Sequence, residues 1–141
     1  MKFLSMLAGL GLCFALIAFF QAKSLFQAKA ELVQYECDVR EIAKIYYKYQ
    51  RDHGQPPQSQ EDLAPLIEKT ASTTRERVKN GEFVFDWGTR IDPSELEAST
   101  RLVILAKPIV QGNQIAVLQD GKVRRLSPDE VKGLLARLRS K

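Results

Sequence analysis

The sequence contains very few of the residues from which active sites and metal sites are built. Of its 141 residues, one is histidine, two are cysteine and one is tryptophan. The histidine, His53, stands at a predicted helix end, where the helix dipole explains it. The chain also has no glycine-rich phosphate loop, no nucleophile elbow and no zinc-ligand spacing. We therefore expect a protein that is not an enzyme and that uses no cofactor and no metal.

The two cysteines cannot pair within the chain. Cys13 and Cys37 fall on what we predict to be one helix, roughly 36 Å apart at 1.5 Å per residue, and a disulfide needs its Cα atoms within about 7 Å. Cys37 lies outside the apolar seam of that helix, so it is either a free thiol or a link between two copies.

Acidic residues gather after the first predicted strand, at Asp86, Asp92, Glu95 and Glu97. A calcium site is one interpretation, but their spacing does not match a regular calcium-binding loop. We favour solvated loop carboxylates.

Charge is absent from a long stretch that begins at Phe3. The eighteen residues from Phe3 to Phe20 include no charged side chain, and as a helix they would span roughly 27 Å, close to the hydrocarbon thickness of a bilayer. A cleaved signal peptide is the alternative, but bulky Phe20 stands where a cut after Ala22 needs a small residue. We predict that residues 1–22 are an uncleaved transmembrane anchor in contact with lipid. The protein would be single-pass, with its domain on the extracytoplasmic side.

Residues 23–52 predict a helical stem with one apolar face. Apolar residues recur there in alternating steps of three and four, at Leu25, Ala28, Leu32, Tyr35, Val39, Ile42, Tyr46 and Tyr49. We call this set the seam and expect it to pack on the sheet of the domain, with a coiled coil between copies as the alternative. All of these except Ala28 are also candidate partner-binding residues.

Residues 53–141 predict one small domain of helices and antiparallel strands. Ser59 and Asp62 cap a helix over 60–69, and 70–81 is a predicted loop with some helical character. Strands are expected at 82–87, 101–107, 113–119 and 122–126, and a last helix at 128–139. Asp120-Gly121 joins the last two strands in a predicted type I′ turn. The fold class is therefore α+β, with the long N-terminal helix packed on a small antiparallel sheet and a short helix at the C-terminus.

The net charge of +4 is concentrated at the C-terminus. Residues 122–141 hold seven basic and two acidic residues, so the other 121 residues carry a net charge of −1. Arg124, Arg125 and Arg137 are candidates for contact with an acidic protein or anionic lipid, and a solvated helix face is the alternative. No interleaved aromatic residues or recognition helix accompany them, so we do not expect nucleic acid as a partner.

Two local sequences are similar to those of known proteins. The first runs from Tyr47 to Gly54 and continues with Pro57, Ser59 and Asp62-Leu63; the second runs from Gln119 to Val123 and ends in Leu126-Ser127. Both resemble the type IV pilin and type II secretion pseudopilin superfamily, the second in particular the pilin-like proteins of planctomycetes and verrucomicrobia. The resemblance implies an anchored helix packed on an antiparallel sheet. Members of this family carry a Gly-Phe cleavage junction and a glutamate at the fifth position of the mature chain. Here the junction is missing, and no glutamate precedes Glu31.

These features together predict a non-enzymatic membrane protein with a pilin-like domain. We expect it to act as a structural or assembly subunit through contacts with other subunits or with copies of itself. The alternative is an accessory or tethering subunit of a larger membrane complex with no filament role.

Overall fold

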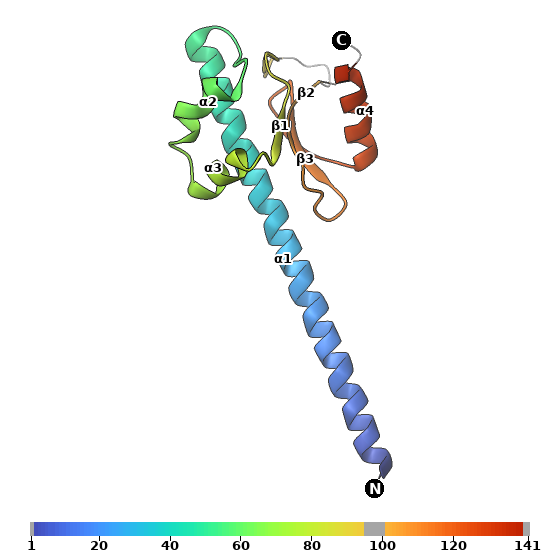
Figure 1. The fold of residues 1–141 in the computed structure, drawn as a ribbon. Helices are drawn as coiled ribbons and strands as arrows, with labels where there is room; N and C mark the ends of the chain where they lie inside the picture. Colours follow the sequence, from blue (N-terminus) through green and yellow to red (C-terminus); the bar gives the residue numbers. More distant parts are fainter. Residues whose placement is uncertain (1, 95–100, 140–141) are drawn as a thin grey trace.

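The computed structural model describes the backbone of residues 2–94 and 101–139, and the side chains of residues 17–94 and 101–138 (Figure 1). It confirms the α+β class. The elements are α1 (Lys2–His53), α2 (Gln60–Ile67), α3 (Ser72–Lys79), β1 (Phe83–Phe85), β2 (Leu102–Ala106), β3 (Gln114–Leu118), β4 (Val123–Leu126) and α4 (Pro128–Arg139).

Helix α1 is one continuous helix of 52 residues, and its N-terminal part extends far beyond the domain (Figure 1). It ends where the sequence predicts, because Gly54 adopts a positive φ of 72° and Pro56 and Pro57 follow. The predicted anchor, residues 1–22, falls mainly outside the residues whose side chains are described. Over the part of the chain that is described, no helix meets the length and apolarity needed to cross a membrane.

Two short helices, α2 and α3, pack against the C-terminal part of α1 (Figure 1). At the start of α2 the Asp62 carboxylate accepts hydrogen bonds from the N–H groups of Gln58 and Ser59, at 2.8 and 3.3 Å, as the predicted cap requires. Helix α3 lies within the stretch predicted as a partly helical loop. It is hydrophilic as a whole, but it buries Thr74 and Val78. Tertiary contacts with α1 therefore favour a helix that the apolar periodicity alone does not reveal.

The four strands form one antiparallel sheet in the order β1-β2-β3-β4. Every residue of β2 and β3 is buried, so these two central strands are covered on both faces. Helix α1 covers one face of the sheet and α4 covers the other, so the domain has three layers.

The hairpin between β3 and β4 has a different turn from the predicted type I′. Gly121 has a φ of 76°, but Asp120 is not among the described residues with positive φ. The N–H of Gly121 donates to the carbonyl of Leu118 at 2.9 Å, and Val117 pairs with Val123. The N–H of Leu118 also donates to the carbonyl of Lys122 at 3.4 Å, so the loop has three residues, Gln119 to Gly121, with the left-handed residue last. The type I′ prediction is therefore wrong. The reason is that the Asp120 side chain is buried and accepts a hydrogen bond from the N–H of Lys122 at 3.0 Å.

Candidate functional site

Most of the seam belongs to the core of the chain's own domain. Five of the predicted partner-binding residues, Leu32, Tyr35, Val39, Ile42 and Tyr46, are each at most 5% exposed and pack against the sheet. Tyr49 is half-buried and stacks on the His53 ring, while Leu25 lies on the projecting part of α1 and is 65% exposed. The sheet thus covers the middle of the seam, and a partner of the folded domain would need other surfaces.

A buried carboxylate joins α1 to α3. Asp38 is 1% exposed, and its oxygens accept hydrogen bonds from the Arg77 guanidinium, the Thr74 hydroxyl at 2.8 Å and the Gln34 amide at 3.1 Å. The Arg77 guanidinium also lies 3.9 Å from the centroid of the Tyr35 ring. These donors compensate the negative charge of Asp38, which would be costly to bury without them. It has the form of a structural contact between elements.

Tyr35 extends this polar group to the start of β1. Its hydroxyl donates to the carboxylate of Glu82, which also lies 3.7 Å from Nε of Arg77. Burial first, and then this hydrogen bond to an anion, raise the pKa of Tyr35 to about 12. The phenol therefore remains protonated at neutral pH and acts as a hydrogen-bond donor.

The loop after β1 is fixed to α1 by two buried polar side chains. Gln50 donates to the carbonyl of Ile91 and accepts from its N–H, both at 2.8 Å. The Tyr46 hydroxyl donates to the carbonyl of Thr89 at 2.8 Å, and burial raises the pKa of this tyrosine strongly. These contacts position Ile91 against the β3–β4 hairpin, where a side chain on Gly121 would approach it to 3.1 Å.

The predicted basic set does not form one patch. Arg124 pairs with buried Asp120 at 2.7 Å, while Arg125 pairs with Glu36 on α1. Arg124 and Arg125 are consecutive strand residues and project to opposite faces of the sheet. Arg137 lies on α4, in the layer opposite α1. The structure therefore gives these arginines separate environments.

The ion pair between Arg125 and Glu36 allows a prediction about the pKa of Glu36. The hydrogen bond from Arg125 chiefly, aided by the charges of Arg125 and Arg40, lowers the pKa of Glu36. A carboxyl whose pKa is lower in the folded state adds stability above its unfolded pKa and loses it as the pH falls through the folded one. We expect Arg125→Ala to raise the pKa of Glu36 toward its ordinary value, as measured by NMR titration of that carboxyl. An unchanged pKa would show that the pair does not form in solution.

The two loop carboxylates that the structure describes, Asp86 and Asp92, have partners within the protein. Asp86 pairs with Arg101 at 2.9 Å, and Asp92 accepts from the N–H of Ser94 at 3.0 Å; Glu95 and Glu97 lie outside the described residues. The described part of the chain contains no group of three or more potential metal ligands. His53 contacts the carbonyl of Tyr49 at 3.0 Å, as expected for a residue at a helix end.

A second apolar stripe runs along the projecting part of α1 and continues on the outward side of this helix beside the domain. It was not separated in the sequence from the overall apolar character of the segment. We call it the outer stripe; its members are exposed and recur every three or four residues: Phe19, Ala22, Phe26, Ala30, Val33 and Cys37. Several members stand two positions before a seam residue, for example Val33 before Tyr35. Two positions correspond to roughly 200° around a helix, so the outer stripe faces away from the domain.

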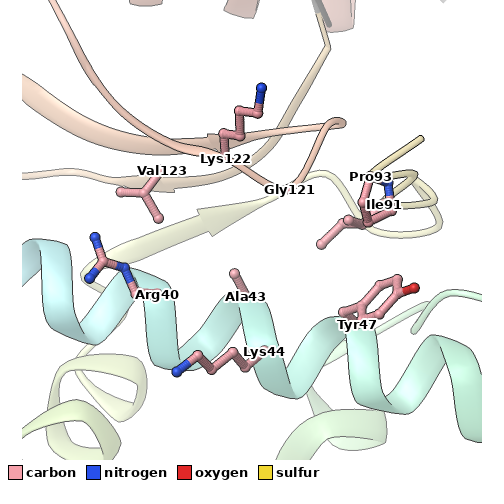
Figure 2. Close-up of a pocket in the computed structure, with 9 residues that line it drawn as sticks. All are labelled: Arg40, Ala43, Lys44, Tyr47, Ile91, Pro93, Gly121, Lys122 and Val123. Atoms are coloured by element: carbon pink, nitrogen blue, oxygen red, sulfur yellow. The ribbon is translucent and has the colours of Figure 1, made fainter. Parts of the chain in front are cut away.

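A groove of about 550 Å³ lies between α1 and the β3–β4 hairpin (Figure 2). Figure 2 shows Arg40, Ala43 and Tyr47 on the helix side and Val123 on the opposite side, with Ile91 pointing into the space between them. The remaining lining residues are Lys44, Pro93, Gly121 and Lys122. The groove therefore combines an apolar interior with three cationic side chains and has no acidic residue in its lining.

Neither the outer stripe nor the groove was predicted from the sequence. The stripe has a signal in the spacing of Phe19, Phe26 and Val33, but the more regular seam dominates the same segment. The groove has none, because its two walls are about eighty residues apart in the chain. Comparison with protein-family models, curated proteins and solved structures finds no match to this chain.

Proposed function

We propose that this chain is a non-enzymatic, single-pass membrane protein and acts as a structural or assembly subunit. Its pilin-like domain would be presented on the extracytoplasmic side by α1. The observation that carries the proposal is the outer stripe: on a helix that continues from the charge-free N-terminal run, Phe26 is 75% exposed and Val33 is 47% exposed. Large apolar side chains left exposed along one line are typical of an interaction surface.

The proposed assembly contact is the packing of α1 helices along their outer stripes. Anchors in one bilayer would hold the copies parallel, and the small residues Ala22 and Ala30 would allow close approach between the bulky ones. This differs from a coiled coil through the seam, whose central residues the domain buries. The resemblance to pilin-like proteins agrees with an α1-mediated assembly.

Cross-linking through Cys37 tests this assembly in membranes. In a Cys13→Ser background, a short thiol cross-linker should join two copies, because Cys37 lies on the outer stripe and is exposed. Val33→Glu places a charge on the stripe and should reduce the cross-linked fraction at least about tenfold, a loss of about 1.4 kcal/mol. Gln27→Glu adds the same charge on an exposed position away from the stripe and should leave the cross-linked fraction unchanged. Equal cross-linking of the two variants would contradict the proposal.

Fractionation and intact-mass analysis test the anchor separately. We expect the full chain in the membrane fraction with Met1 or Lys2 at its N-terminus. A mature chain beginning after Ala22, recovered without detergent, would exclude membrane anchorage.

The alternative is an accessory or tethering subunit with no filament role. The missing cleavage junction and the absence of glutamate before Glu31 favour it over a filament subunit. It predicts a monomer in the cross-linking experiment and co-purification with a different membrane protein.

A further inference from the structure

We propose that the free edge of β4, together with the groove beside it, binds an extended acidic and apolar segment of a partner protein by strand addition. This inference goes beyond the assembly proposed for α1, because it concerns a surface of the domain that remains available whether or not α1 helices associate.

The outer edge of β4 presents unused backbone groups. The sheet ends at β4, and the N–H of Leu118 donates to the carbonyl of Lys122 at 3.4 Å. In an antiparallel pair the hydrogen-bonded residues alternate, so Arg124 and Leu126 also direct their backbone groups toward β3. Val123 and Arg125 therefore direct theirs outward. Within the described residues, no backbone–backbone hydrogen bond outside the strand pairing involves either of them.

The groove adjoins this edge and supplies a place for side chains. Val123 is both the first residue of β4 and part of the groove wall, across from Arg40 and Ala43 of α1 (Figure 2). A strand added beside β4 would project alternate side chains toward the α1 layer and therefore into or along the groove. Backbone hydrogen bonds would give affinity, and the groove would select side chains.

The positive charge of the groove indicates that the bound segment is acidic. Three cations line the groove, Arg40, Lys44 and Lys122. Among the described residues none of them forms an ion pair, and the Glu36 carboxylate, which feels the charge of Arg40, is paired with Arg125. If alternate residues of a bound segment are acidic, their carboxylates would project to one side, toward Arg40 and Lys44 of α1, and apolar residues at the positions between them would project to the other side, toward the apolar α4 layer.

The same charges argue against two other occupants. Pairing of β4 with β4 of a second copy would bring Arg124 and Arg125 of the two chains together, and like charges on an edge strand oppose such pairing. Anionic lipid is too distant: Arg40 lies 18 residues after Ala22, roughly 27 Å along the helix from the end of the proposed anchor, and screening acts over about 8 Å.

A peptide-binding experiment on the full chain in detergent micelles tests the inference. The probe is a short, capped, fluorescent peptide of alternating glutamate and valine, and its binding is measured by anisotropy. A peptide with lysine in place of glutamate should bind at least about tenfold more weakly. The glutamate peptide with an N-methyl group on every residue should lose binding to a similar degree, because neither of its edges can donate hydrogen bonds.

Two pairs of variants separate the backbone and charge contributions. Arg125→Pro removes an outward N–H and should weaken binding at least about tenfold relative to Arg125→Ala, which keeps that N–H and loses the same side chain. Arg40→Glu should weaken binding about tenfold, whereas Lys132→Glu, an equal charge change in the α4 layer, should alter it less than about threefold.

The inference is overturned if proline and alanine at position 125 bind alike, or if charge reversal at positions 40 and 132 has the same effect. Circular dichroism verifies that each variant is folded. Should Arg125→Pro unfold the domain, the N-methylated peptide decides: binding equal to that of the unmodified peptide excludes strand addition.

Discussion

Replacing Ile42 by alanine is expected to lower the free energy of unfolding of the domain by about 3 kcal/mol. Ile42 is fully buried at the centre of the interface between α1 and the sheet. Alanine there removes buried apolar surface and leaves a cavity that the surrounding layers cannot fill without moving. Denaturant unfolding of the full chain in detergent, followed by the fluorescence of Trp87, measures the change, because this residue packs on Tyr46 and Phe85.

Val33→Ala is the matched control on the same helix. Val33 is 47% exposed on the outer stripe, so its truncation should change stability by less than about 0.5 kcal/mol. A cost below about 1 kcal/mol for Ile42→Ala would mean that α1 is not the covering layer of the sheet. Val33 also belongs to the proposed assembly surface. An unchanged free energy of unfolding would therefore show that the outer stripe is not needed for the folding of the domain.

Replacing Asp38 by asparagine is the second large effect, again with an expected loss of about 3 kcal/mol. Asparagine keeps the shape of the side chain but removes the charge that balances the Arg77 guanidinium, whose side chain is only 21% exposed. Its amide would also bring hydrogen atoms toward a guanidinium that can only donate. The loss is measured by the same denaturant unfolding at neutral pH.

Two further variants serve as controls for Asp38→Asn: one changes an exposed acid, Asp52, and the other changes Arg77, which pairs with Asp38. Asp52→Asn removes a carboxylate that pairs with Lys48 on the surface and should leave the unfolding midpoint within experimental error. Adding Arg77→Met to Asp38→Asn should recover part of the stability, with a coupling of at least about 1 kcal/mol in the double-mutant cycle. Additive effects would show that the two side chains do not interact.

The strength of a local pattern decides what could be predicted from the sequence. The end of α1 at Gly54, the cap of α2 at Ser59 and the start of α4 at Pro128 each follow from residues within one turn of helix, and the structure has them where they were expected. The burial of Val39 and Ile42 follows from the seam, since a continuous apolar stripe needs a covering layer.

The missed features depend on residues distant in the chain. Asp38 resembles an ordinary helix-surface acid until α3 brings Arg77 beside it, 39 residues later. The turn at Asp120 is an exception, because the groups that bind its buried side chain, the N–H of Lys122 and the guanidinium of Arg124, are near it in the chain; the dipeptide signal alone does not include these contacts. The groove needs α1 and the hairpin together, and so no segment of sequence contains it.

The continuity of α1 gives the molecule an unusual mechanical property. The same helix serves as a projecting rod and as one layer of the domain, and its C-terminal end lies at the far end of that layer (Figure 1). Rotating the rod about its own axis therefore turns the domain by an equal angle. If two α1 helices pack along their outer stripes, that contact alone fixes the direction in which the β4 edge of each domain points.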